Sequence, residues 1–266
     1  STPSNSSAAS DVYKRQRYNG ANDVRGGGHF SGRLTAPLTF AGAVCRQILS
    51  VHEIRIGAHA LRIASVTDTA FDPVEVPDAL LERLSTEYFS LIDRSVEAAM
   101  RQEIEAARKF TDSVGGVVEC AVTGVPAGIG SPMFYGVENV LSSILFGVPA
   151  VKGVEFGDGF AAASLHGSEN NDAFTAENGQ VKTRTNHCGG ILGGITTGMP
   201  LILRAAFKPT PSIGQEQNTV NLNTLQNEPL VVHGRHDPCI VPRAIPVVEA
   251  AVAVGLVNLM AERGRL

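Results

Sequence analysis

Residues 93–123 read DRSVEAAMRQEIEAARKFTDSVGGVVECAVT, and this stretch predicts a helix that is directly followed by a strand. In its first half an apolar side chain recurs every fourth residue, with charged side chains on the other faces, so we predict a helix over 93–109. Two glycines at 115–116 end the helical pattern, and the β-rich run 117–123 predicts a strand. The protein therefore combines both kinds of element.

The same two patterns recur on both sides of this stretch, without an internal repeat or a sharp linker. Further helices are predicted over 35–49, from 77–78 onward, over 137–146 and over 247–260, and further strands over 52–63, 151–156 and 201–207. The long polar stretch 157–179 predicts a lid, a binding loop or disorder. Hairpin-like pairs and long loops fit an α+β fold as well as an α/β fold.

Composition and charge narrow the class of protein. The chain has 266 residues, of which 43% are apolar and 18% charged, a balance typical of soluble globular proteins. A net charge of −4 without a polybasic block argues against nucleic-acid binding. No apolar run approaches the roughly 18–20 residues of a membrane span. The four well-separated cysteines predict buried thiols in a reducing, cytosolic compartment rather than a zinc site.

The first 16 residues, STPSNSSAASDVYKRQ, are polar and predict a foreign or disordered tail. Residues 7–16 resemble a translated sequencing-adapter scar. We therefore expect native sequence to begin near Arg17 and residues 17–266 to form a single domain.

Residues 25–33, RGGGHFSGR, place four glycines and two arginines around His29, Phe30 and Ser31. Because glycine in a regular element costs about 0.5–1 kcal/mol relative to alanine, this run needs a compensating role. Backbone N–H groups and arginines that face an anion would supply one. A tight turn with ordinary surface charge is an equal alternative.

Four further stretches combine glycine or proline with polar side chains: 157–172, with GDGF and GSENND; 186–198, NHCGGILGGITTG; 208–212, KPTPS; and 234–239, GRHDPC. The glycines of NHCGGILGG would let backbone press against a flat ring or a phosphate, but packing between a sheet and a helix is the favoured explanation for them alone. Proline stiffens KPTPS around one lysine and two hydroxyls. An exposed turn is the alternative there.

The stretch GRHDPC presents an arginine, a histidine and an aspartate at consecutive positions, which only a loop directs to one site. The following proline restricts the backbone of Asp237. Such a group is suited to orienting a base or holding a cationic ring, and a charged turn with internal ion pairs is the alternative. No third ligand is placed by spacing beside His233 and His236, so no metal site is predicted.

Seven motifs follow one another in a single order between about Tyr18 and Met260: RGGGHFSGR, GVPAGIGSP, AVKGVEFGDGF, GSENND, NHCGGILGGITTGMP, KPTPSI and GRHDPCIVPRA. This ordered set resembles the chorismate synthase family. The resemblance implies an α+β fold, a sandwich of antiparallel sheets around a helical layer, in a homotetramer. It also implies the conversion of 5-enolpyruvylshikimate 3-phosphate to chorismate and phosphate by an anti-1,4-elimination that requires reduced FMN. Some members of the family reduce their flavin with NADPH, and others need an external reductant.

The resemblance further implies the roles of individual residues. The flavin-binding positions fall on His29, Phe30, Ser31, Pro149, Ala150, Gly193, Lys208, Pro209, Thr210, Pro211, Ser212 and Arg235. Asp237 is implied as the carboxylate that acts near flavin N5, with Ser31 as its hydrogen-bond relay. We assign Arg33 and Arg243 to the substrate, because a ligand with a phosphate and two carboxylates needs cationic partners.

The chain also departs from the family. A GESHG-like and an RPxHAD-like stretch, whose histidines are thought to protonate the flavin and the leaving phosphate, are absent from the sequence, and His29 falls on a flavin-lining position instead. The chain therefore resembles a piece that lacks its N-terminal part. We expect the full gene product to be an active cytoplasmic lyase and this piece to be inactive, with unpaired sheet edges. The alternative is a noncatalytic module that binds flavin or phosphorylated ligands.

Overall fold

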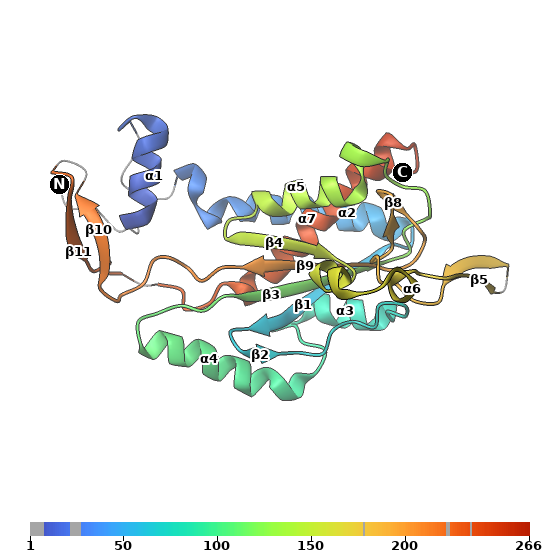
Figure 1. The fold of residues 1–266 in the computed structure, drawn as a ribbon, viewed down its shortest axis with the longest axis horizontal. Helices are drawn as coiled ribbons and strands as arrows, with labels where there is room; N and C mark the ends of the chain where they lie inside the picture. Colours follow the sequence, from blue (N-terminus) through green and yellow to red (C-terminus); the bar gives the residue numbers. More distant parts are fainter. Residues whose placement is uncertain (1–7, 22–27, 178, 222–223, 235) are drawn as a thin grey trace.

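The computed structural model describes residues 8–21, 28–177, 179–221, 224–234 and 236–266 (Figure 1). Its helices are α1 (Ala8–Tyr18), α2 (Thr35–Val51), α3 (Asp78–Thr86), α4 (Glu97–Lys109), α5 (Val137–Gly147), α6 (Gly167–Asn170) and α7 (Val241–Glu262). Its strands are β1 (Arg55–Ile63), β2 (Val66–Thr67), β3 (Gly116–Thr123), β4 (Val151–Phe156), β5 (Phe174–Glu177), β6 (Gln180–Thr183), β7 (Ile191–Leu192), β8 (Ile195–Thr196), β9 (Leu201–Phe207), β10 (Gln217–Asn221) and β11 (Gln226–Leu230).

Five strands form one antiparallel sheet in the order β2-β1-β3-β9-β4. Strand β9 pairs with β3 on one side and β4 on the other, although a long segment of chain separates it from both. Three two-stranded pairs, β5–β6, β7–β8 and β10–β11, complete the strands. Antiparallel sheets combined with helices confirm the predicted α+β class.

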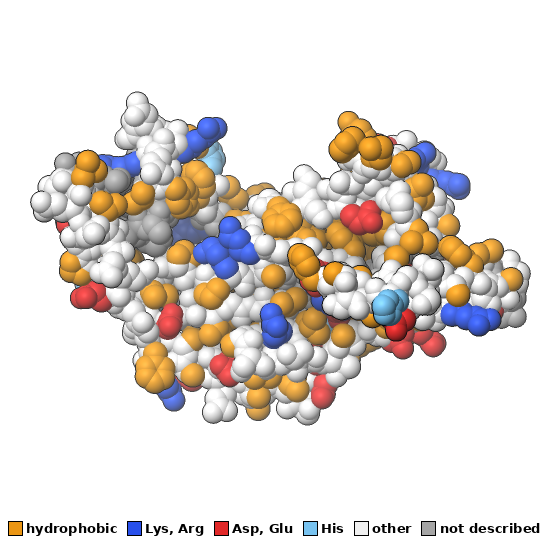
Figure 2. Space-filling view, viewed as in Figure 1, with side chains coloured by type: hydrophobic (Ala, Val, Ile, Leu, Met, Phe, Trp, Pro, Cys, Tyr) orange, Lys and Arg blue, Asp and Glu red, His pale blue; other side chains and the backbone are white. Residues whose placement is uncertain are grey.

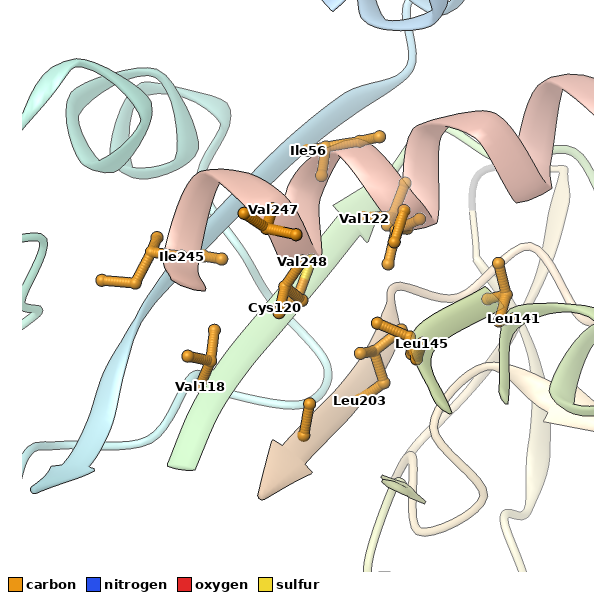
Figure 3. Close-up of a cluster of buried hydrophobic side chains, with 14 of the residues drawn as sticks. Ile56, Val118, Cys120, Val122, Leu141, Leu145, Leu203, Ile245, Val247 and Val248 are labelled. Carbon is orange, nitrogen blue, oxygen red and sulfur yellow. The ribbon is translucent and has the colours of Figure 1, made fainter. Parts of the chain in front are cut away.

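The main core lies between the sheet and α7, an alanine- and valine-rich helix (Figure 3). Side chains of β3 and β9 face those of α7 and α5 there, including Val118, Cys120 and Leu203 from the strands and Val248 and Leu145 from the helices. All five are fully buried. Each apolar side chain of this size contributes about 1.5–3 kcal/mol on burial, so this layer supplies much of the stability of the fold.

The opposite face of the sheet is covered by α3. Successive strand residues point to opposite faces, and Ala121, next to Cys120, packs in a second cluster with Leu81 and Leu84 of α3. Figure 1 shows α3 and α4 on one side of the sheet and α5, α7 and α2 on the other. The sheet is therefore a central layer between helices.

Helix α2 packs on α7 but leaves one of its faces open. The α2 backbone approaches α7 so closely that a Cβ on Gly42 would lie 2.2 Å from the Cβ of Ala250. The other face exposes an apolar stripe that consists of Phe40, Val44, Ile48 and Val51. Among the described residues no second large sheet covers this stripe, so the helical layer of the expected sandwich has one sheet on it.

Two predicted boundaries differ from the structure for identifiable reasons. Helix α7 begins at Val241, six residues before the predicted start, and it includes Pro246 in its interior. Proline in a helix interior removes a hydrogen bond and usually ends the helix, so the sequence favoured a start after it. The predicted tail is helical from Ala8 to Tyr18, which corrects the expectation of disorder for that part. Its foreign origin stays a prediction.

Two helical segments, Gly32–Val51 and Val241–Glu262, are long and apolar enough to cross a membrane by length and composition. The expectation of no such segment rested on uninterrupted apolar runs, whereas both segments include charged residues. The second segment is 72% buried inside the protein, as a core helix is, and the first is 11% buried. Since core helices pass the same test, this is weak evidence for a membrane span.

A row of charged side chains crosses the α3-covered face of the sheet. His59 of β1, Glu119 of β3 and Arg204 of β9 are directly paired across the strands. The fully buried His59 ring lies between two carboxylates: Nδ1 is 2.8 Å from Asp68 Oδ2, and Nε2 is 3.0 Å from Glu119 Oε2. Arg204 Nε donates to Glu119 Oε1 (2.9 Å), and its Nη1 donates to the carbonyl of Gly157 (3.0 Å).

The two carboxylates favour the doubly protonated imidazolium, which donates from both ring nitrogens. Burial, the largest single influence, lowers the pKa of His59, but the hydrogen bonds to Asp68 and Glu119 and their charges raise that pKa overall. Burial likewise opposes ionisation of Asp68 and Glu119, yet hydrogen bonds from His59 and from backbone N–H groups lower both pKa values. The row is a paired, buried ionic network.

This network predicts a pH window of stability. The His59 contribution is complete below its unfolded pKa of 6.5 and is lost as the pH rises through its raised folded pKa. The carboxylate contributions are present above the unfolded pKa values of 3.8 (Asp68) and 4.5 (Glu119) and are lost as the pH falls through the lowered folded values. Urea unfolding of the chain across this pH range should therefore show decline on both sides.

The variant His59→Gln should lose about 3–5 kcal/mol of unfolding free energy, because it leaves buried carboxylates without their cation. It should also lose most of the decline on the alkaline side. Arg108→Gln, which removes an exposed helix-surface ion pair with Glu105, is the matched control and should change little. An unchanged alkaline decline in His59→Gln would assign that decline to another group.

Candidate functional site

Three segments that are far apart in the sequence meet at the end of the sheet where β9 finishes. The backbone N–H of Lys208 donates to the carbonyl of Ala150 (3.0 Å), which joins KPTPS to the start of β4. The Thr210 hydroxyl donates to the carbonyl of Asp237 (2.8 Å), which joins KPTPS to the GRHDPC loop. The structure therefore brings Pro149, Ala150, the 208–212 segment and Asp237 to one place.

The strand register explains this convergence. Phe207, the last residue of β9, pairs with Val151, the first residue of β4, so the residues beyond them are neighbours. The segment before β3 holds both loops in turn: the Ser113 hydroxyl donates to the carbonyl of Thr210 (2.7 Å), and the Val114 N–H donates to that of Pro238 (2.8 Å). Two prolines in KPTPS prevent β9 from continuing as a strand.

Asp237 and Arg243 form an ion pair at the start of α7. Both side chains are more than half exposed, so solvent weakens the attraction between them. Arg243 lies in the first turn of α7, and the GRHDPC loop leads directly into that turn. Arg243, which we assigned to the substrate, therefore contacts the carboxylate that we assigned to the reaction centre.

The site is cationic around Lys208. This half-buried lysine has only the carbonyl of Pro209 as a hydrogen-bond acceptor (3.3 Å) among the described residues. Burial lowers the pKa of Lys208, and the nearby charge of Lys152 lowers it further. An ammonium that is half-buried and has no carboxylate partner within the described part of the chain fits an anionic ligand, and FMN, with its phosphate, is such a ligand.

The first glycine-rich motif leads into α2 at the same end of the molecule. In Figure 1 the start of α2 and the tip of β9 both point toward the part that carries α1 and β10–β11. Figure 2 shows Lys and Arg side chains beside the hollow between that part and the main body. The segment 28–34, which contains the site residues predicted in this motif and directly precedes α2, therefore lies toward the end of the sheet that carries KPTPS.

Individual residues of that motif have local partners. Ser31 Oγ accepts from the Arg33 N–H (3.2 Å) and caps the 3₁₀ turn Gly32–Leu34. The Phe30 ring makes edge contacts with Tyr13 and Tyr18 of α1, at centroid separations of 5.3 and 6.2 Å. Helix α1 therefore covers part of the ring that we expect to line the flavin.

Gly193 lies at the other end of the sheet. It forms the β7–β8 turn, and Gly190 just before β7 approaches Pro200 and Leu201, where β9 begins. The seven residues of β9 span roughly 20 Å at the usual rise of a strand. One ligand at Lys208 therefore does not reach Gly193 of the same chain. Arg235 falls outside the described residues, so the structure leaves its place open.

Sequence reasoning missed Lys152 and Ser113 at this site. Lys152 stands inside the quoted motif AVKGVEFGDGF but was not assigned a role, and Ser113 lies in the short connection before β3. Their proximity to Lys208 and Thr210 depends on which strands pair and in which register. The sequence of β4 or of β9 alone does not show that these two strands pair.

The fold and the site define an α+β protein with a cationic ligand site built from loops at one end of an antiparallel sheet. A family model described as chorismate synthase matches residues 6–261. The chain therefore belongs to the chorismate synthase family, as its motifs predicted. The match begins inside the stretch that we expected to be foreign.

Relatives and a solved structure agree with this assignment. The chorismate synthase of Lancefieldella parvula is 47% identical over 245 residues, 88% of this chain and 64% of the relative. That of Thermococcus gammatolerans is 48% identical over 254 residues, 95% of this chain and 69% of the relative. A crystal structure of a chorismate synthase aligns with a TM-score of 0.78 at 26% identity, over 95% of this chain and 70% of that one. The chain spans about two thirds of the length of the relatives it matches.

Two adjacent glycines of the β7–β8 turn provide a contrast between structural and ligand roles. Both have positive φ, but a Cβ on Gly194 would lie 2.4 Å from the carbonyl oxygen of Ser131, whereas a Cβ on Gly193 would meet no atom within 4 Å. We expect Gly193→Ala to cost about 1 kcal/mol of stability and Gly194→Ala clearly more. Thermal unfolding of the two variants measures this difference. Equal losses of stability in the two variants would contradict the predicted difference between Gly193 and Gly194.

Proposed function

We propose that this chain is part of a chorismate synthase that converts 5-enolpyruvylshikimate 3-phosphate to chorismate and phosphate by an anti-1,4-elimination. Membership of the family supports the reaction. The observation that carries the proposal is the meeting of Pro149–Ala150, the 208–212 segment and Asp237 around a half-buried cation. These are segments that the motifs had separately assigned to one ligand.

Reduced FMN, when bound, supplies the electron-rich ring that the elimination requires. Lys208 would hold an anionic group of the flavin, and Pro209, Thr210, Pro211 and Ser212 would shape the loop around it. The Thr210 hydroxyl already donates to the Asp237 carbonyl, so its oxygen keeps lone pairs to accept from a ligand. His29, Phe30, Ser31 and Arg235 would complete the flavin contacts.

The residues of this chain act by holding charge and protons in place. The Asp237 carboxylate, held by Arg243, would accept a hydrogen bond from the flavin near N5 and so help to position the proton that leaves the substrate. Ser31, whose oxygen accepts from the Arg33 N–H, keeps its own proton free to donate to Asp237. Arg33 and Arg243 would stabilise the charge of the departing phosphate.

The position of Gly193 bears on the assembly. Since Gly193 lies roughly 20 Å or more from Lys208 at the usual rise of a strand, we propose that it meets the flavin bound by a neighbouring copy. This agrees with the homotetramer that the family resemblance implies. The protein would work in the cytoplasm, and NADPH is a candidate reductant for its flavin.

The remaining third of the family's length would complete the fold. We infer that this chain lacks an N-terminal part of the protein, which would carry the two missing histidine motifs and cover the apolar stripe of α2. The piece alone would then be inactive. The alternative function, a noncatalytic module for flavin or phosphorylated ligands, would use the same cationic site.

The flavin site is tested by titrating FMN into the chain, with and without a substrate analogue, while the flavin spectrum is followed. We expect a saturable spectral change that the analogue strengthens.

In the full gene product, Asp237→Asn should lower turnover by about 10²–10⁴-fold, the usual contribution of a positioned acid–base group. Glu177→Gln, an exposed change in the β5–β6 hairpin, is the control. Full turnover in Asp237→Asn would remove its assigned role.

Shared sites are tested by mixing two inactive variants of the full gene product, Asp237→Asn and Gly193→Val. If each site takes Asp237 from one copy and Gly193 from another, mixed oligomers contain some sites with both native residues and regain activity. If both residues served the same chain's site, mixing would restore nothing. Size-exclusion chromatography of each variant checks that assembly itself is intact.

A further inference from the structure

Lys152 lies in a β-bulge at the edge of the sheet. Val151 of β4 pairs with Phe207 and Gly153 pairs with Ala206, so Lys152 is an extra residue without a partner on β9. Such an insertion bends the strand and re-aims the side chain, and bulges are over-represented beside active sites. This one lies directly next to the Lys208–Ala150 contact.

The bulge changes which face of the sheet Lys152 occupies. In a regular strand, residues two apart share a face, so Lys152 would lie with Val154 and Phe156 against the main core. Instead Val151 packs in that core together with Val154, although the two are three residues apart. Lys152 is exposed, and its charge acts on Lys208. Because of the extra residue, the Lys152 side chain lies beside the site and does not enter the core.

The backbone before the bulge is strained. Ala150 has a φ of 75°, a region that residues with a side chain rarely adopt. Strain of this kind persists where the surroundings hold it, and it clusters at ligand sites. Here the Ala150 carbonyl is held by the Lys208 N–H, which fixes the two lysine-bearing segments against each other.

The charges of Lys152 and Lys208 act on each other without a compensating acid among the described residues. Among the residues that the structure describes, neither one forms an ion pair with a carboxylate. The pKa of Lys208 is lowered by burial first and by Lys152 second, with no carboxylate among its causes. Two neighbouring ammonium groups repel each other, and an anion bound beside both would offset that repulsion.

Protection of a sheet edge is the competing explanation for Lys152. Strand β4 is one of the two edge strands of the five-stranded sheet, and both lysines and bulges discourage edge-to-edge association. That role accounts for a lysine on β4 but not for a second, half-buried lysine that follows the interior strand β9 and shares its surroundings. Edge protection also does not explain the strained backbone of Ala150.

We propose that Lys152 and Lys208 together form the binding site for a phosphate monoester dianion, with Lys152 positioned for this by the bulge. The identity of the ligand rests on the proposed function, which supplies two phosphate monoesters: the ribityl phosphate of FMN and the phosphate of the substrate. The site itself rests on the bulge, the register and the unpaired charges. We favour the FMN phosphate, because Ala150 and Lys208 both belong to the flavin-binding set.

The first experiment compares FMN with riboflavin, which lacks the phosphate, in titrations of the full gene product. Lys152→Gln should weaken FMN binding about tenfold, the loss expected for one charge-assisted hydrogen bond, and leave riboflavin binding unchanged. Lys182→Gln, an exposed change on β6, should affect neither. If the site takes the substrate phosphate instead, Lys152→Gln should raise the Michaelis constant for substrate and spare FMN. Unchanged binding of both phosphates in Lys152→Gln would overturn the proposal.

The second experiment uses this chain and does not depend on flavin binding. Limited acetylation at pH 8, read by peptide mass spectrometry, should modify Lys208 faster than Lys182, because a larger fraction of Lys208 is unprotonated. Inorganic pyrophosphate should protect Lys208 and Lys152 together and leave Lys182 unprotected. Lys152→Gln should slow modification of Lys208 toward the rate of Lys182.

The outcomes separate the two proposals. Protection by pyrophosphate with no FMN binding by the full gene product would support the anion site and reject the proposed flavin function. FMN binding that is equal in wild type and Lys152→Gln, with neither lysine protected, would reject the anion site and keep the flavin function. Increased aggregation of Lys152→Gln with unchanged ligand binding would assign Lys152 to edge protection.

Discussion

The pairing of β9 between β3 and β4 is the constraint on which the rest of the structure depends. It places KPTPS at one end of the sheet and the glycine-rich turns of 186–198 at the other. Backbone ladders set this register, and the buried faces of the strands hold it, because a slip of one residue would send every core side chain to the wrong face. Loops that are far apart in the sequence are thus brought together by a rigid scaffold, as is common for ligand sites.

The same strand links the core electrostatics to a distant loop. Arg204 of β9 joins the buried pair of His59 and Glu119 to the carbonyl of Gly157. Gly157 in turn packs so closely on the His187–Gly189 backbone that a Cβ there would lie 2.0 Å from the His187 carbonyl oxygen. Charge pairing inside the sheet therefore helps to define the polar loop at its surface, which a purely apolar strand face would not do.

Local patterns predicted the elements well and their meeting points poorly. The period of the helix ending at Lys109 and the β-rich run of β3 needed no tertiary information, whereas α7 begins before Pro246 because its buried face outweighs the lost hydrogen bond. The family motifs were visible as an ordered set, but the separation of Gly193 from Lys208, the Arg243–Asp237 pair and the bulge at Lys152 all depend on how the strands and loops are placed in space. Register is a property of paired strands, and no single strand encodes it.

The buried imidazolium makes folding a reaction that consumes protons. Above the unfolded histidine pKa of 6.5 the free side chain is mostly neutral, whereas the two carboxylates beside the folded His59 raise its pKa and favour its charged form. Between the unfolded and the raised folded pKa of His59, folding of the chain therefore takes up a hydrogen ion from its surroundings. Hydrogen ions, and the buffers that carry them, thus take part in the folding equilibrium of this sheet alongside its apolar contacts.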